Sequence, residues 1–295
     1  MTRSGFVALA GRPNAGKSTL VNSIVADKVA IISDRPQTTR RASRGVATGP
    51  DGSWQLVLVD LPGVQRPRDA LTERMQRQVE RALADADAAL FVLNGEQEIG
   101  PGDRFIADSL RRSGVPAVTV LNKVDRLDRA RTLRGLTDAA GLGVEGELFP
   151  ISAKSGAGVG PVVEQLVSLV PEGPFMYPAA ARSDQSLELQ LAELIREQVL
   201  LRTREELPHA VEVEIDEVEE RDDGLLVVRA RVWAETESQK GILVGAGGRM
   251  VRAVGTAARK EIERLLDRRV HLDLNVRVRR GWRRDEGLLD RLGIE

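Results

Sequence analysis

Up to position 170, apolar residues follow two alternating patterns. Short apolar runs typical of buried strands are separated by stretches in which apolar residues recur at helical spacing. The predicted strands are 6–10, 43–48, 54–59, 88–93, 116–121 and 148–151, and the predicted helices follow residue 17 and occupy 69–84, 102–112, 126–140 and 159–170. This alternation predicts an α/β domain with a mostly parallel sheet, helices on both faces, and ligands at the carboxyl ends of the strands.

A different order follows the proline-rich stretch 171–178. It predicts a helix with an apolar stripe from Leu187 to Val199, and then an α+β arrangement of two strands, two helices and a last strand. These elements are expected at 210–218, 225–234, 239–244, 249–266 and 270–279. We therefore predict domains at 1–173 and 185–295, joined by a linker at 174–184.

Composition agrees with two globular domains. The chain has 295 residues, and about 150 residues per domain suggests two domains. The absence of cysteine excludes disulfides, thiolate metal sites and cysteine nucleophiles. No apolar run reaches the length of a membrane span, and residues 1–6 contain no signal-peptide core, so we expect a cytoplasmic location.

The stretch 11–18 has the P-loop spacing, with Gly11, four further residues and then Gly16, Lys17 and Ser18. It lies between a predicted buried strand and a helix, where such a loop must lie. The glycines let backbone N–H groups surround phosphates, and the helix N-terminus favours the same anion. Lys17 would reach the outer phosphates, and the Ser18 hydroxyl would ligate Mg²⁺.

Three further polar motifs follow predicted strands. Asp60 precedes Gly63 at the end of one strand, so its carboxylate can hold Mg²⁺ while the glycine N–H touches a terminal phosphate. Asn122-Lys123-Val124-Asp125 follows a later strand, and Ser152-Ala153-Lys154 follows the last one. Because strand ends share one edge of a parallel sheet, all three motifs can reach one nucleotide.

These two last motifs indicate guanine. The Asp125 carboxylate can accept from both N1–H and the exocyclic amine of guanine, donors that adenine lacks on that edge, and an unmatched buried acceptor pair discriminates strongly. Asn122 and Lys123 would tie this loop to the P-loop, and the Ala153 amide would donate to O6. The residues expected to contact GTP are Gly11, Arg12, Pro13, Asn14, Ala15, Gly16, Lys17, Ser18, Thr19, Asp60, Leu61, Pro62, Gly63, Asn122, Lys123, Asp125, Ser152, Ala153 and Lys154.

The motif set resembles a translation-factor-class small GTPase, and Pro36-Gln37-Thr38-Thr39-Arg40 resembles the Era family in particular. The resemblance extends over essentially the whole chain. It implies that Thr39 joins Ser18 and Asp60 in the magnesium site when GTP is bound. The expected catalytic set is therefore Asn14, Lys17, Thr39 and Gly63.

The water-positioning residue is unusual. Ras-like enzymes place a glutamine after the Asp-x-x-Gly motif, whereas this chain has Val64, which cannot orient water. The family resemblance implies a substitute, in which Asn14 and switch-loop carbonyls hold a potassium ion. We therefore expect a slow GTPase, stimulated by K⁺, that converts GTP to GDP and phosphate.

The C-terminal order of helix, two strands, helix, Gly-x-x-Gly, helix and strand is that of a type II KH domain. Residues 184–223 carry 14 acidic and 4 basic side chains, whereas 240–284 carry 13 basic and 4 acidic. This asymmetry favours nucleic acid, although two solvated faces that neutralise each other would give the same pattern. A Gly-x-x-Gly loop lets the backbone clamp about four nucleotides. The expected RNA-binding residues are Lys240, Ile242, Val244, Gly245, Ala246, Gly247, Gly248, Arg249 and Arg252.

Other candidate residues fit structural roles. His209 and His271 lack metal-ligand spacing. The three tryptophans are also interpreted as structural, and only Trp282, within a run of arginines, has base stacking as an alternative.

The resemblance implies an RNA-binding GTPase that holds 16S ribosomal RNA near its 3′ end and assists small-subunit assembly and maturation. It also implies a monomer with peripheral association at the cytoplasmic face of the cell membrane. The alternative is a GTPase whose C-terminal domain is a protein or membrane adaptor, with its basic stretch on anionic lipid.

Overall fold

A computed structural model of the full chain describes residues 1–33, 35, 38–63, 69–203 and 207–294. The chain divides into two compact units. The first comprises Met1–Ile32, Thr39–Arg68 and Thr72–Asp184, and the second comprises Gln185–Glu295 with the short segments Ser33–Thr38 and Asp69–Leu71. Among the described residues, no helix combines the length and apolar character needed to cross a membrane.

The first unit is built on a six-stranded sheet with the strand order β2-β3-β1-β4-β5-β6. Only β2 is antiparallel to its neighbour. The strands are β1 (Arg3–Ala10), β2 (Ser43–Thr48), β3 (Trp54–Asp60), β4 (Ala88–Asn94), β5 (Ala117–Asn122) and β6 (Leu148–Pro150). The order places β1 and β4 at the centre, so the loops after the parallel strands open on one edge, as the apolar pattern predicts.

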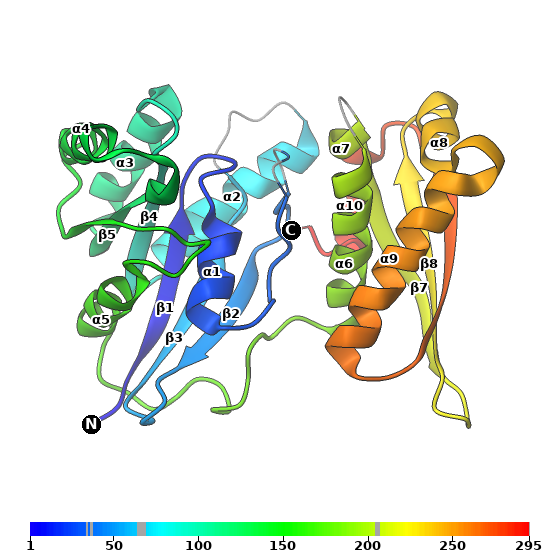
Figure 1. Ribbon diagram of the computed structural model, residues 1–295, viewed down its shortest axis with the longest axis horizontal. Coiled ribbons are helices and arrows are strands. Elements are labelled where there is room, and N and C mark those ends of the chain that lie inside the picture. The colour runs from blue at the N-terminus through cyan, green and yellow to red at the C-terminus, as the bar shows by residue number, and fades with distance from the viewer. Residues whose placement is uncertain (34, 36–37, 64–68, 204–206, 295) are drawn as a thin grey trace. The chain divides into compact units, whose positions relative to one another are not determined.

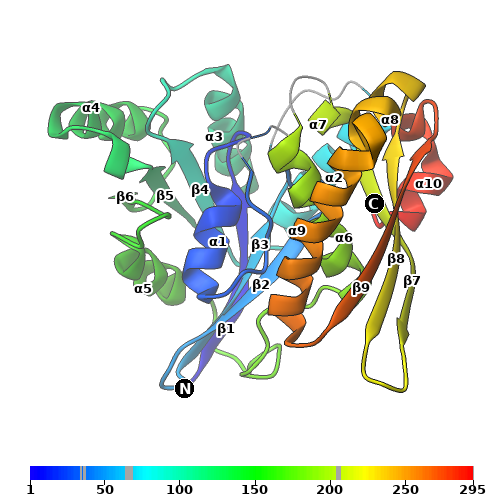
Figure 2. The same ribbon diagram turned by 45° about the vertical axis from the view of Figure 1, so that its right-hand side comes forward.

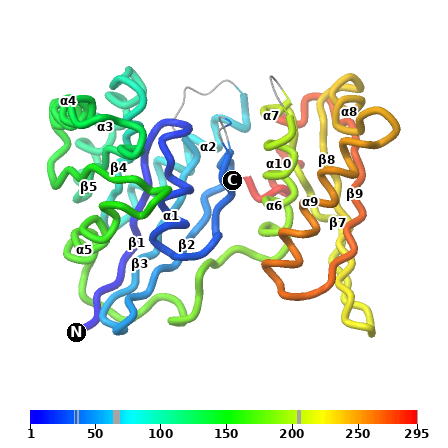
Figure 3. Tube along the Cα trace, viewed as in Figure 1, coloured from blue at the N-terminus to red at the C-terminus, as the bar shows by residue number. Residues whose placement is uncertain are grey.

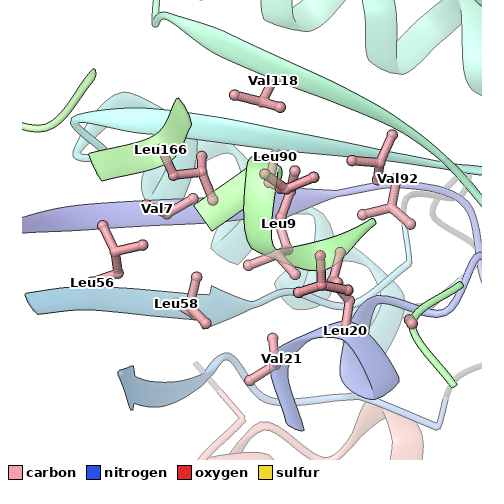
Figure 4. Packing of buried hydrophobic residues seen from close by; sticks show 14 of the residues in the cluster. Val7, Leu9, Leu20, Val21, Leu56, Leu58, Leu90, Val92, Val118 and Leu166 are labelled. Carbon is pink, nitrogen blue, oxygen red and sulfur yellow. The ribbon is translucent and has the colours of Figure 1, made fainter. Parts of the chain in front are cut away.

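Helices cover both faces of this sheet (Figure 1). On one face α1 (Lys17–Val25) and α5 (Val159–Leu169) pack on the strands, and on the other lie α2 (Ala70–Ala84), α3 (Pro101–Ser113) and α4 (Arg129–Ala140). Figure 4 shows the first of these interfaces, where Leu9 and Leu58 of the sheet lie close to Leu20 and Val21 of α1. All four side chains are fully buried. This packing fixes the start of α1, and therefore the P-loop that precedes it.

The predicted helix 126–140 begins later than its sequence pattern suggests. A short 3-10 turn, η1 (Val124–Arg126), comes first, and the helix starts only after Asp128. The Asp128 carboxylate accepts from the Arg131 amide at 2.7 Å and caps the helix. The turn keeps Asp125, which we expect to contact guanine, outside the helix.

The second unit is a three-stranded sheet with the order β7-β8-β9, in which β7 and β8 are antiparallel and β8 and β9 parallel. Helices cover one face of this sheet, as Figure 2 shows, and side chains of α6, α8 and α9 join its core. The elements are α6 (Leu187–Arg202), α7 (Leu207–Ala210), β7 (Glu212–Glu220), β8 (Leu226–Ala234), α8 (Glu237–Val244), η2 (Ala246–Gly248), α9 (Arg249–Leu266), β9 (Val270–Val278), η3 (Trp282–Arg284) and α10 (Glu286–Arg291). The sequence pattern did not predict α7, η3 or α10, which are too short for a periodic signal.

Trp282 has a structural role, as expected for the tryptophans. Its side chain is fully buried rather than presented to a base, and its Nε1 donates to the carbonyl of Ala210 at 2.9 Å. Leu288 and Leu289 of α10 are buried as well. The tryptophan belongs to the core of the second unit, and the base-stacking alternative suggested by the neighbouring arginines is not supported.

The linker is held against the first unit. The buried Gln55 side chain donates to the Tyr177 carbonyl at 3.0 Å and accepts from the amides of Met176 and Tyr177. Further along, the Val46 amide donates to the Arg182 carbonyl at 2.8 Å. Figure 3 lets the reader follow this segment past the β2–β3 hairpin. The segment predicted as a linker, 174–184, is therefore fixed by hydrogen bonds and forms part of the first compact unit.

Candidate functional site

The Lys17 side chain is hydrogen-bonded to the backbone of the P-loop. Nζ of Lys17 donates to the carbonyls of Gly11 and Arg12 at 3.0 and 3.2 Å. Burial lowers the pKa of this ammonium to about 8, and the nearby Asp60 carboxylate opposes part of that shift. The ammonium thus takes carbonyl partners at a position where phosphate oxygens would be stronger ones.

A glycine is required at position 16. Gly16 has φ 99°, in the left-handed region, and a Cβ there would lie 2.2 Å from Nδ2 of Asn122. The same asparagine side chain donates to the Ala15 carbonyl at 2.9 Å. The close approach therefore fastens the motif after β5 to the P-loop.

Three side-chain oxygens meet beside the P-loop. Ser18 Oγ donates to Asp60 Oδ2 at 2.6 Å and lies 3.1 Å from Thr39 Oγ1. Thr39 Oγ1 is 3.3 Å from the same carboxylate oxygen. Two hydroxyls and one carboxylate at this separation are hard oxygen donors spaced like neighbouring positions of an octahedral shell, and Mg²⁺ keeps water or phosphate in the remainder. The described residues include no cluster of three or more His, Cys, Asp or Glu that could hold a metal ion.

Asn122 joins three loops. Besides its bond to Ala15, its Oδ1 accepts from the amides of Lys123 and Ala153 at 2.8 and 2.9 Å. The Ala153 amide, which the sequence offers as a donor to guanine O6, is therefore bonded to Asn122 here. We expected Lys123 to contact the P-loop. Its Nζ instead pairs with Glu96 Oε2 at 3.0 Å.

The Asp125 carboxylate lies beside Ser152. The Ser152 hydroxyl is the main reason that the pKa of Asp125 falls below its usual range, and the charges of Arg126 and Lys154 lower it further. An ionised carboxylate with two acceptor oxygens is what recognition of the guanine edge requires. Asp125 and Ser152 come from motifs 27 positions apart, brought together by the adjacent β5 and β6.

The structure adds three residues that motif spacing does not reveal. Asp103 of α3 accepts from Nε of Arg12 at 2.9 Å, and Asn94 donates to the Asn14 carbonyl at 3.4 Å. Glu96 is the third, through its ion pair with Lys123. Asn94 directly follows the predicted strand 88–93, a position that could have drawn attention to it, whereas Asp103 and Glu96 act through contacts with no sequence signature.

Some expectations lie outside the described residues, namely the water-positioning place held by Val64 and the switch residues Pro36 and Gln37. Gly63 is described, and a Cβ on it would lie 2.6 Å from the Pro13 nitrogen, so it packs directly on the P-loop.

In the second unit, the glycine loop projects between α8 and α9. The amides of Gly245 and Gly248 donate to Gly241 and Gly245 carbonyls at 2.9 and 3.0 Å. The amides of Ala246 and Gly247 between them make no hydrogen bond within the described part of the chain. Gly247 and Gly248 have φ 59° and 78°, backbone angles that residues with a Cβ rarely adopt. The loop thus presents backbone donors with no side chain to cover them.

The side chains around this loop are in part as expected. Ile242 and Arg249 are exposed, and Lys240 and Val244 are partly exposed. Arg252 folds back, with Nε donating to the Gly248 carbonyl at 3.3 Å and Nη2 donating to the Gly247 carbonyl. Its guanidinium therefore supports the loop in this structure and would have to turn outward to contact a phosphate.

Comparison with known proteins assigns both halves. Residues 6–123 match the family described as 50S ribosome-binding GTPase, and residues 206–283 match the KH domain family. Proteins named GTPase Era are 41% identical over 296 residues in Halothermothrix orenii and 44% identical over 298 residues in Mycobacterium avium, covering 99% of this chain and of each relative.

Two solved structures are similar over nearly their full length. One is a single-residue variant of Aquifex aeolicus Era bound to GDP·AlF₄⁻, with TM-score 0.95 and 32% identity, covering 99% of both chains. The other is Era in complex with MgGDPNP and nucleotides 1506–1542 of 16S ribosomal RNA, also at TM-score 0.95 and 32% identity, covering 100% of this chain and 99% of that one.

Fold, motifs and comparisons define a GTPase with a P-loop domain followed by a KH domain, as the sequence predicts. More narrowly, the chain belongs to the Era family of GTPases.

Proposed function

We propose that this GTPase binds the 3′ region of 16S ribosomal RNA through its KH domain and assists assembly and maturation of the small ribosomal subunit. The observation that carries the proposal is the Gly245–Gly248 loop between two helices, in which Ala246 and Gly247 are exposed and their amides make no hydrogen bond among the described residues. Such a loop is how KH domains clamp a single-stranded backbone. The similar Era structure with nucleotides 1506–1542 of 16S ribosomal RNA supports the choice of RNA.

In the first unit, the proposed substrate is GTP with Mg²⁺. Ser18, Thr39 and Asp60 would hold the metal, which when bound neutralises charge on the β and γ phosphates. Lys17 would exchange its carbonyl partners for phosphate oxygens, while Gly63 offers its amide next to Pro13. Asp125 would read guanine through its two oxygens. The bound GDP·AlF₄⁻ and MgGDPNP of the similar Era structures support this assignment.

Potassium is the proposed replacement for a water-positioning glutamine. Asn14 has φ 62°, and its carbonyl is held by Asn94, so the middle of the P-loop has a defined backbone course. Steady-state hydrolysis is measured in matched KCl and NaCl buffers, with Asn14→Ala beside the natural chain. Faster turnover in KCl that Asn14→Ala abolishes supports the site, and equal turnover in both salts overturns it.

The RNA proposal is tested with the glycine loop. Gly248→Asp places a carboxylate in the proposed path of the RNA backbone, and we expect RNA affinity to fall by at least about tenfold while GTP hydrolysis without RNA is unchanged. The matched control is Gly224→Asp, which also replaces a left-handed glycine (φ 75°) but lies in the β7–β8 turn, at the other end of the sheet from α8 (Figures 1 and 2).

The probe is an RNA with the last nucleotides of the 16S sequence, compared with a scrambled RNA of the same length. Equal affinity for both RNAs overturns specific recognition of the 3′ region. Binding that instead follows the anionic fraction of lipid vesicles, and is insensitive to Gly248→Asp, supports the adaptor alternative. The proposed location is the cytoplasm, with association at the cytoplasmic face of the membrane scored by the same vesicle assay.

A further inference from the structure

The turn after β4 connects the phosphate-binding and base-binding loops. Asn94 pairs in register with Asn122 across the β4–β5 ladder. Its Nδ2 donates to the Asn14 carbonyl at 3.4 Å, and the next amide, of Gly95, donates to the Asn122 carbonyl at 2.9 Å. The Asn94 side chain also accepts from the Glu96 amide at 3.1 Å. These hydrogen bonds hold the backbone of this turn on both sides, and they therefore fix the position of the Glu96 backbone.

The Glu96 carboxylate holds two cations at once. Oε2 lies 3.0 Å from Nζ of Lys123, and Oε1 lies 3.0 Å from Nη1 of Arg126. These hydrogen bonds lower the pKa of Glu96, with Arg126 the larger cause, so the carboxylate is ionised at neutral pH. The side chains of Lys123 and Glu96 are 24% and 33% exposed and that of Arg126 is 53% exposed, so water screens the pair with Arg126 more than the pair with Lys123.

The two cations flank Asp125 in the sequence. Arg126 is its direct neighbour, and its charge already acts on the Asp125 carboxylate. Recognition of guanine needs both carboxylate oxygens free to accept from the base. An ion pair between Asp125 and either cation would compete for those oxygens, because a guanidinium or an ammonium is a stronger donor to a carboxylate than a neutral base.

We propose that Glu96 is a positioning residue of the guanine site, which keeps Lys123 and Arg126 paired with itself and leaves Asp125 free to read the base. The proposal rests on the assignment of Asp125 to guanine above. It adds a determinant of base specificity that belongs to none of the nucleotide motifs. Glu96 acts through the two cations and touches no nucleotide atom itself.

The test is nucleotide affinity of the full chain with GDP and with inosine diphosphate, which lacks the exocyclic amine. Glu96→Gln keeps the shape and removes the charge, and we expect GDP binding about fivefold weaker. The preference for GDP over inosine diphosphate should fall by about threefold, since a partly engaged Asp125 loses its second acceptor. The matched control is Glu98→Gln, which removes a nearby carboxylate charge. Glu98 contacts Arg12 through its backbone carbonyl, which accepts from Arg12 at 3.2 Å, and the substitution keeps this bond.

A double variant separates competition from simple loop support. If freed cations compete for Asp125, adding Arg126→Gln to Glu96→Gln should restore part of the GDP preference, whereas a merely structural Glu96 would give no rescue. An unchanged preference in Glu96→Gln, or no rescue in the double variant, overturns the inference. Failure of the underlying assignment looks different, because the natural chain and Asp125→Ala would then bind GDP and inosine diphosphate with the same preference.

Discussion

Asp103 and Arg12 form a bond between helix α3 and the P-loop. The carboxylate accepts from Nε of Arg12 at 2.9 Å, and its other oxygen accepts from the Gly100 amide at 2.9 Å, at the start of the helix. The Asp103 side chain is 2% exposed and that of Arg12 is 25% exposed. One buried carboxylate thus caps a helix and holds the first side chain of the phosphate-binding loop after Gly11.

We expect Asp103→Ala to lower the free energy of unfolding by about 2 kcal/mol, because a helix cap and a largely buried ion pair are lost together. It should also weaken GDP binding, since Arg12 loses its anchor. Chemical denaturation and nucleotide titration check both effects. Asp108→Ala on the same helix is the control, because Asp108 pairs with Arg111 at the surface and should cost less than about 0.5 kcal/mol. Equal effects of the two changes would contradict the role given to Asp103.

Lys17 should make nucleotide affinity depend on pH. Its pKa in the unbound protein is about 8, and phosphate oxygens favour the ammonium, so binding raises the pKa. The binding free energy is therefore fully present below about pH 8 and is lost above it, by up to about tenfold in affinity per pH unit.

GDP titrations from about pH 7 to about pH 9 measure this slope. In Lys17→Arg the guanidinium stays charged across that range, while any titration of the base itself is shared by both proteins. A slope that is the same in both would show that Lys17 does not titrate.

The oxygen trio predicts a metal requirement. Ser18→Ala removes one of the three oxygens, and the Mg²⁺ concentration for half-maximal hydrolysis should rise by about tenfold or more. Thr39→Ala should affect the GTP-bound form more than the GDP-bound form, if Thr39 joins the metal when the γ phosphate is present. Ser23→Ala lies on the same helix, away from the trio, and should leave the magnesium titration unchanged. An unaltered titration in Ser18→Ala would exclude it as a ligand.

Trp282 should matter for stability and not for RNA. Trp282→Phe removes the hydrogen bond to the Ala210 carbonyl and leaves that buried acceptor unsatisfied, at a cost of about 1–2 kcal/mol. Affinity for the 16S probe should be unchanged at a temperature where the variant is folded. Weaker RNA binding by a fully folded Trp282→Phe would support the alternative that the tryptophan stacks on a base.

The nucleotide motifs were predictable from sequence because phosphate and base chemistry restrict both residue type and spacing. Lys17, Ser18 and Asp60 lie together because the P-loop follows β1 and Asp60 ends β3, and these parallel strands are neighbours in the sheet. Thr39 came from the family resemblance, since a polar loop has no periodicity from which to derive it. The KH order was readable from alternating patterns, down to helix α9, whose bounds at Arg249 and Leu266 match the expected ones.

What sequence could not give are contacts between side chains distant along the chain. Glu96 meets Lys123 only because β4 and β5 are neighbours, and Asp103 meets Arg12 only because α3 packs beside β1 and β4. We expected Lys123 at the P-loop. The motif shows the residue type but not that Glu96 competes for the ammonium. The structural role expected for Trp282 is confirmed, although its arginine neighbours in sequence do not share its burial.

The linker has a consequence for the solubility of the first unit. β2 is the last strand on its side of the sheet, and such an edge is open to pairing with another chain. Here Gly45 of β2 forms an antiparallel bridge with Ser183, and Val46 donates to Arg182. The linker thus shields that edge as a short extra strand would. A fragment ending at residue 173 would expose it to edge-to-edge aggregation, whereas one that continues through Asp184 would carry its own cover.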